Sequence, residues 1–203
     1  MSAEYRVPGI PTMYDGIQYR SRLEARWAAF FGLLGWRFEY EPIDMAGWIP
    51  DFLIHGFQHP VLVEVKPVTS FPGEVADKIE KAAKVSGWST TSDEPRDNAH
   101  CELMIVGCSV PISSLMDSGS QIGWINDPLF GGANARWADA SVAAEGKRYD
   151  LSSYQGWWNG RITGERYAGK SCFAGYGQAN WLVTLWREAG NIVQWKGKRS
   201  KAT

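Results

Sequence analysis

Two short apolar segments, residues 49–55 and 61–66, are separated by a short turn, and this spacing predicts an antiparallel β-hairpin. With the turn centred between residues 57 and 58, Asp51 lies directly opposite Glu64. Directly opposed residues share one face of a sheet, with Cβ atoms about 5 Å apart. The hairpin therefore brings two carboxylates together.

Lys66 follows Glu64 by two residues, so the period of a strand puts its ammonium group on the same face, while Val63 and Val65 point the other way. Two adjacent carboxylates repel each other, and a bound cation relieves that repulsion. Mg²⁺ favours one or two carboxylates with waters and phosphate oxygens. The pattern predicts a metal site made by Asp51, Glu64 and the backbone carbonyl of Val65. Lys66 can then orient a water or offset charge on a phosphate, as phosphodiester hydrolysis requires.

Hydrophobic periodicity predicts the elements around this hairpin: helices at 19–34 and 73–85, and strands at 36–41 and 102–106. Ser21 is a candidate N-cap of the first helix, and Gly35 is a candidate stop. The expected order is helix, three strands, helix, strand. Residues 1–16 contain several prolines and glycines and are expected to form an irregular lead-in.

Glu24 lies on the first predicted helix, at the margin of its apolar stripe. A carboxylate in that position is costly without a partner. Two interpretations remain open: Glu24 closes the metal site from the helix side, or it pairs with Arg20 one turn earlier. Arg20, Arg22 and Arg26 are expected to project outward.

Together these residues resemble a known signature. Pro50-Asp51, then twelve residues, then Glu64-Val65-Lys66 resembles the PD-(D/E)XK motif of restriction-endonuclease-like nucleases. The expected αβββαβ order also matches that family's core, which is a mixed α/β fold whose sheet is flanked by helices. The amino-acid sequence around these motifs is most similar to that of small phage or prophage nucleases of this superfamily.

The resemblance covers residues 14–107 and implies a metal-dependent deoxyribonuclease, a phage or prophage endonuclease that hydrolyses DNA phosphodiester bonds with Mg²⁺, for which Mn²⁺ can substitute. By resemblance, Asp51 and Glu64 would bind the metal and Lys66 would position the nucleophilic water. Glu24 is similar to the acid on the family's first helix and would assist through the metal shell.

Two other classes of function stay open. One is a DNA-binding module of the same fold without significant catalysis, which serves replication, recombination or packaging. The other is a structural or assembly protein whose acids form only structural pairs. A divalent ion between Asp51 and Glu64 favours the enzyme, whereas Arg or Lys partners filling that space favour a structural role.

The charge balance bears on DNA binding. The 203 residues include 21 Lys+Arg and 22 Asp+Glu, for a formal net charge of −1. This argues against a generally basic nucleic-acid binder but permits a local basic site. The candidate DNA-binding residues are Lys78, Lys81 and Lys84 on the second predicted helix and Lys196, Lys198 and Arg199 in the tail. The helix lysines equally fit a solvated face balanced by Glu74, Asp77 and Glu80.

The composition changes near residue 112, where Gly, Ser, Asn and Trp become frequent. We expect a nuclease core with its lead-in at 1–111, and a Trp- and Gly-rich C-terminal extension or small subdomain at 112–203 that binds DNA or a partner. A strand at 121–125 and a helix at 179–189 are expected within it. Aromatics mixed with Arg and Lys at 154–176 either stack on bases or form the subdomain's own core or a homodimer contact.

The cellular setting follows from what the sequence lacks. Residues 1–6 do not begin a secretory signal, and the near-apolar stretch 27–36 is about half of what spans a bilayer. Three cysteines without a CxxC pair indicate reduced thiols, and a zinc site at His100, Cys101 and Cys108 fits no common spacing. We expect a cytoplasmic protein, in the host cell if phage-encoded, with no membrane contact and no small-molecule cofactor.

Overall fold

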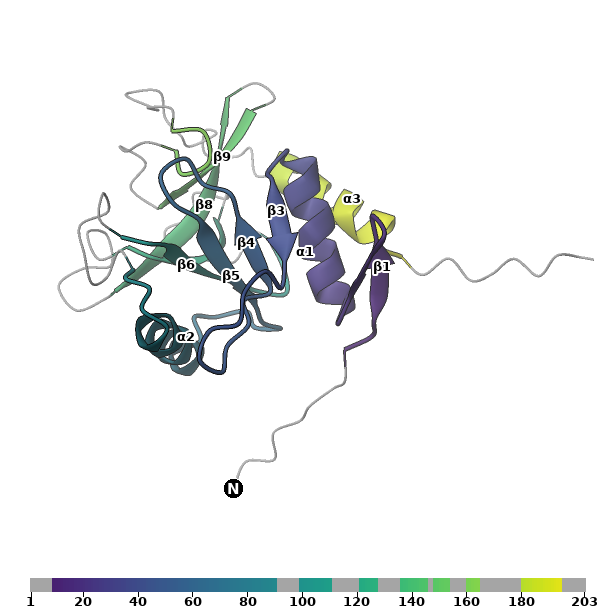
Figure 1. Ribbon diagram of the computed structural model, residues 1–203. Coiled ribbons are helices and arrows are strands. Elements are labelled where there is room, and N and C mark those ends of the chain that lie inside the picture. Colours follow the sequence, from purple (N-terminus) through teal and green to yellow (C-terminus); the bar gives the residue numbers. More distant parts are fainter. Residues whose placement is uncertain are drawn as a thin grey trace, which may run out of the picture.

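The computed structural model describes residues 9–90, 99–110, 121–127, 136–145, 148–153, 160–164 and 180–194. Within these ranges the chain has a mixed α/β architecture with three α-helices, a seven-stranded sheet and a separate two-stranded hairpin (Figure 1). The expected DNA-binding residues Lys196, Lys198 and Arg199 lie outside the described residues, as does most of the aromatic and basic segment 154–176.

The helices are α1 (Arg22–Leu33), α2 (Gly73–Val85) and α3 (Asn180–Ile192). The strands of the large sheet are β3 (Phe38–Tyr40), β4 (Phe52–Ile54), β5 (Val61–Val65), β6 (Glu102–Val106), β7 (Gln121–Asn126), β8 (Trp137–Glu145) and β9 (Arg148–Ser153). They lie side by side in chain order. Among the neighbouring strands described here, β5 and β6 alone run parallel, because α2 lies in the long crossover between them.

The β4–β5 hairpin has the register that the sequence predicts. Phe52 pairs with Val63 and Ile54 pairs with Val61. Carried one residue further, this register sets Asp51 across from Glu64. The predicted order of helix, three strands, helix and strand is also confirmed, by α1, β3, β4, β5, α2 and β6 in succession.

Alternate residues of β5 supply two hydrophobic cores on the two faces of the sheet. Val63 belongs to the core that α1 and α3 cover, in which Trp27 and Trp186 are buried. Leu62 belongs to the core that α2 covers, with Ile79. Figure 1 shows α1 and α3 together and α2 well away from them. Each fully buried aliphatic side chain contributes about 1.5–3 kcal/mol. This burial holds β5 firmly in the sheet, next to the polar residues at its end.

The predicted N-cap and the predicted stop of α1 are both confirmed. Ser21 has an extended backbone, and its hydroxyl accepts a hydrogen bond from the Glu24 N–H at 3.1 Å. Such a cap contributes about 1 kcal/mol. Gly35 ends the helical segment with a φ of +73°, a left-handed conformation that glycine adopts without strain.

The expectation of an irregular lead-in over 1–16 is wrong for its described C-terminal part. β1 (Thr12–Tyr14) pairs antiparallel with β2 (Ile17–Tyr19). Asp15 and Gly16 join the strands with φ values of +47° and +78°. Positive φ at both central residues is the signature of a type I′ hairpin turn, for which Asp-Gly is a preferred sequence. The hairpin delivers the chain directly to Arg20 and α1.

The described part of the predicted extension continues the same sheet. β7 pairs antiparallel with β6, and β8 and β9 follow in order. The helix predicted at 179–189 is α3, which packs against α1: the Arg26 guanidinium donates to the Trp186 carbonyl at 2.8 and 3.1 Å and lies 3.9 Å from the centre of its ring. Arg26 therefore does not project outward as expected. No helix in the described ranges is long and apolar enough to cross a bilayer.

Candidate active site

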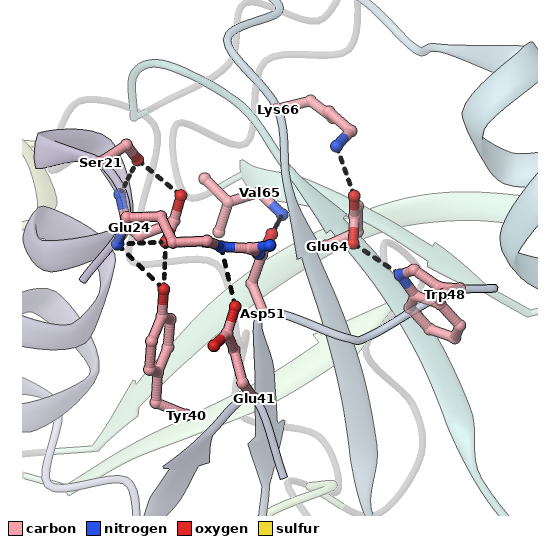
Figure 2. A network of polar contacts seen from close by, with 10 residues as sticks. Ser21, Glu24, Tyr40, Glu41, Trp48, Asp51, Glu64, Val65 and Lys66 are labelled. Carbon is pink, nitrogen blue, oxygen red and sulfur yellow. Dashed lines mark hydrogen bonds and ion pairs between the residues drawn. The ribbon is translucent and has the colours of Figure 1, made fainter. Parts of the chain in front are cut away.

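Three of the four predicted catalytic side chains gather where β5 ends, and the fourth reaches them from α1 (Figure 2). Asp51 and Glu64 are almost fully buried, with 3% and 7% of their surface exposed. Lys66 pairs with Glu64, and Glu24 on α1 is linked to Asp51 through Arg20. Two carboxylates buried at the end of one hairpin are costly unless something compensates them.

Asp51 uses both carboxylate oxygens. Oδ2 accepts a hydrogen bond from the Val65 N–H at 2.7 Å, and Oδ1 accepts one from Nη2 of Arg20 at 2.5 Å. The contact with Val65 ties the segment before β4 to the end of β5. It involves the N–H of Val65, whereas the predicted metal-ligand role belongs to its carbonyl and stays a prediction.

Glu64 is held from two sides. Oε2 accepts a hydrogen bond from the Trp48 indole N–H at 2.6 Å, and Oε1 forms an ion pair with the Lys66 ammonium group. Lys66 keeps 38% of its side chain exposed. Trp48 was not singled out from the sequence, and its place in the loop just before the Pro50-Asp51 motif was the only available signal.

Glu24 is fixed by neutral donors. Oε1 accepts from the Ser21 hydroxyl at 2.7 Å, and Oε2 accepts from the Tyr40 hydroxyl at 2.6 Å (Figure 2). Nε of Arg20 lies 3.8 Å from Oε2, so the pairing one turn earlier is present. Glu24 thus lies beside the site and reaches Asp51 through a guanidinium.

Arg20 joins three acids that come from different elements. Its guanidinium lies 2.5 Å from Asp51, 2.8 Å from Glu41 and 3.8 Å from Glu24. The side chain is 57% exposed, yet its charged end turns toward these acids, so the expected outward projection is wrong. Burial alone would lower the pKa of Arg20, but Asp51, a hydrogen bond to Tyr40, Glu41 and Glu24 together raise it.

Glu41 is a second residue that the sequence prediction missed. It has a φ of +46°, which is rare for a residue with a side chain. Its N–H donates to the Asp51 carbonyl at 3.1 Å. The unusual backbone at Glu41 is therefore tied directly to the residue at the centre of the site, and strained backbone of this kind gathers at functional sites.

The charges of this group do not balance. We define the acidic cluster as Glu24, Glu41, Asp51 and Glu64 with their cationic partners Arg20 and Lys66. Four carboxylates face two cations, an excess of two negative charges when all are ionised. Burial first, and then the charge of Glu64, raise the pKa of Asp51 to about 7, although Val65 and Arg20 act against them.

The donor set of the acidic cluster fits a divalent cation. It offers carboxylate oxygens from Asp51 and Glu64, and its excess charge matches that of Mg²⁺ or Mn²⁺. Among the described residues, which include His100, Cys101 and Cys108, no group of three or more His, Cys, Asp or Glu side chains is placed so that it could hold a metal ion. Sites for Mg²⁺ commonly use one or two carboxylates and complete the shell with water and phosphate.

The cationic partners bear on the structural alternative. Arg20 at Asp51 and Lys66 at Glu64 are the kind of partners that a purely structural role predicts. Two features distinguish this cluster from a settled structural network: its four acids share only two cations, and both cations are partly exposed.

The predicted DNA-binding residues Lys78, Lys81 and Lys84 are exposed on α2. Glu80, one of three acids expected to balance them, turns instead toward β8. It pairs with Arg136 at 3.3 Å and accepts a hydrogen bond from the Trp137 indole at 2.6 Å. Glu80 therefore also links α2 to the start of β8, beyond the balancing role that the sequence indicates.

A second buried polar group lies at the other end of the β5–β6 pair, and sequence analysis did not identify it. We define the Arg161 cluster as Arg161, Glu102, Asp127 and His59. The Arg161 guanidinium contacts the carboxylates of Glu102 and, at 2.8 Å, Asp127, while His59 lies 3.1 Å from Glu102. Burial alone would lower the pKa of Arg161, but the two carboxylates raise it.

No family model, no curated protein and no solved structure matches this chain. The case for its function therefore depends on the motif, the hairpin register and the charges of the acidic cluster.

Proposed function

We propose that this chain is a Mg²⁺-dependent nuclease with a restriction-endonuclease-like core, and that it hydrolyses DNA phosphodiester bonds. The observation that carries the proposal is the pair of buried carboxylates of Asp51 and Glu64, which face each other across the β4–β5 hairpin with Lys66 beside them, in a cluster of four acids and two cations. The succession of α1, β3, β4, β5, α2 and β6 supports the assignment of the core.

Each residue of the cluster has a proposed task. Asp51 and Glu64 would hold the metal, together with the carbonyl of Val65. When bound, Mg²⁺ supplies charge stabilisation at the phosphate and a more acidic water. Lys66, partly exposed and paired with Glu64, would orient the attacking water or offset phosphate charge. Glu24, fixed by Ser21 and Tyr40, would set the charge around Asp51 from the α1 side.

The lysines of α2 are the proposed contacts to the DNA backbone. Lys78, Lys81 and Lys84 are exposed, and α2 follows β5 in the chain, with only residues 66–72 between them. Lys196, Lys198 and Arg199 would add phosphate contacts from the tail. Binding through such contacts weakens steeply as salt rises. Since the motif resembles that of phage and prophage nucleases, we expect the protein to act on DNA inside the host cell.

The test is cleavage of a panel of linear, circular, single-stranded and four-way-junction DNAs, with Mg²⁺ or Mn²⁺ and with a chelator. We expect degradation that requires the metal. Glu64→Ala and Lys66→Ala should each abolish it while the protein stays folded. Glu74→Ala, which removes an exposed acid of α2, is the matched control and should cleave normally. Wild-type cleavage by both purified site variants would contradict the mechanism.

The ion pairs of Arg20 with Asp51 and of Lys66 with Glu64 favour a structural role of these acids over catalysis. One candidate without catalysis is a DNA-binding module of the same fold. Such a module would bind the panel in gel-shift assays at low salt. It would leave every DNA intact with either metal. A structural or assembly protein would neither bind nor cleave.

A further inference from the structure

We infer that Arg20 competes with the divalent ion for the Asp51 carboxylate, so that this arginine sets the metal affinity of the site. The inference deepens the proposed function and rests on it. In the proposed picture, Arg20 holds Asp51 while the metal is absent and withdraws when the metal binds.

Arg20 is the partner of Asp51 that can leave. The other partner is the Val65 N–H, which belongs to the backbone of a buried strand and cannot move without disrupting β5. Arg20 makes its contact through a long side chain that is 57% exposed. A ligand that needs an oxygen of Asp51 therefore displaces the guanidinium at the lower cost.

A second acid, Glu41, can keep the Arg20 guanidinium when it leaves Asp51. Its Nε already lies 2.8 Å from Glu41, whose side chain is 32% exposed. A metal ion and a guanidinium on one carboxylate repel each other. Glu41 keeps the guanidinium paired after it leaves Asp51, so the positive charge of Arg20 still has an acidic partner.

The backbone of Arg20 stays in place during such an exchange. Its N–H donates to the Tyr40 hydroxyl at 3.0 Å and to Oε2 of Glu24 at 3.2 Å. Arg20 also lies between two fixed residues, the buried Tyr19 and the N-cap Ser21. The exchange therefore requires only a movement of the side chain.

The test is a direct titration of Mn²⁺ into metal-free protein without DNA. Binding is measured by calorimetry or by the electron paramagnetic resonance signal of free Mn²⁺. Arg20→Gln should bind Mn²⁺ roughly threefold to tenfold more tightly than the wild type, the range expected when a partly exposed ion pair no longer competes. Arg22→Gln makes the same change of charge two residues away on the exposed face and should leave the affinity unchanged. Arg20→Lys, which keeps the charge without the planar fork, should fall between wild type and Arg20→Gln.

Equal or weaker Mn²⁺ binding by Arg20→Gln would overturn the inference. If that variant does not fold, equal or weaker binding by Arg20→Lys overturns it in the same way. Asp51→Asn separates the two levels of the argument. If wild-type binding is lost in Asp51→Asn while the Arg20 variants bind no more tightly, competition is wrong and the metal site stands. If the wild-type protein binds no Mn²⁺ at all, the metal site and the competition both fall.

Discussion

The acidic cluster and the Arg161 cluster lie at opposite ends of the same pair of parallel strands, β5 and β6. Both are buried polar groups in contact with hydrophobic cores. In the Arg161 cluster, a guanidinium whose side chain is 6% exposed contacts two carboxylates, and His59 contacts one of them. In the acidic cluster, four carboxylates share two cations, of which Arg20 is 57% exposed.

This difference separates a structural network from a site that can bind a ligand. Buried charges stabilise a fold only when their partners and hydrogen bonds are complete. The Arg161 cluster keeps its guanidinium buried against both carboxylates, and it joins residues 160–164 to the sheet. The acidic cluster leaves negative charge in excess, which costs stability in the absence of a ligand and favours binding of a cation. Functional sites commonly reduce the stability of the fold in this way.

The largest expected effect is the loss of the Arg161 cation. Arg161→Met should lower the free energy of unfolding by about 3–5 kcal/mol, because it removes the cation that the buried carboxylates of Glu102 and Asp127 share. Lys66→Met removes a cation from the acidic cluster. It should cost less than about 1 kcal/mol because Lys66 is partly exposed. Urea denaturation of both variants measures the difference. Equal losses would remove the distinction between the clusters.

A smaller effect of opposite sign is expected at Asp51. Its pKa is about 7 in the folded protein and 3.8 as the ordinary value, so the folded state holds the proton more tightly. The contribution of Asp51 to stability is therefore greatest below about pH 4 and is lost as the pH rises to 7. Asp51→Asn should raise the free energy of unfolding of metal-free protein by about 2 kcal/mol at pH 8. The gain should shrink toward pH 4.

Asp150→Asn is the matched control. Asp150 accepts hydrogen bonds from the N–H groups of Leu151, Ile162 and Thr163, at 2.7, 2.7 and 3.1 Å. An amide cannot accept from all of these donors, so this variant should lose about 2 kcal/mol at pH 8, where Asp51→Asn gains stability. The two variants are compared by denaturation at several pH values in the presence of a chelator. Destabilisation by Asp51→Asn at pH 8 would contradict the account of the acidic cluster.

The sequence predicts the centre of the candidate site well because the centre depends on local pairing. The position of the turn and the alternation along two strands fix the register of β4 and β5, and this register aligns Asp51 with Glu64 and Lys66. The first-helix acid Glu24 was identified because it lies at the margin of an apolar stripe.

The surroundings of the site could not be predicted in the same way. Arg20, Glu41 and Trp48 lie at element ends or in loops, where the direction of a side chain depends on tertiary packing and not on a repeating pattern. The Arg161 cluster joins residues that are far apart in sequence, and no periodicity encodes such a contact. The hairpin at residues 12–19 was missed although Asp15-Gly16 is a strong turn signal, because the nearby prolines and glycines favoured an irregular segment.

We propose that the acidic cluster is the site of DNA cleavage, whereas the Arg161 cluster only stabilises the fold. The most direct measurement is the rate of Mg²⁺-dependent DNA cleavage by Glu64→Gln and Glu102→Gln, each corrected for its folded fraction. We expect Glu64→Gln to lose about a thousandfold or more in rate while remaining as stable as the wild type. Glu102→Gln should lose stability, and its folded fraction should cleave at the wild-type rate. Wild-type cleavage by Glu64→Gln would contradict the account.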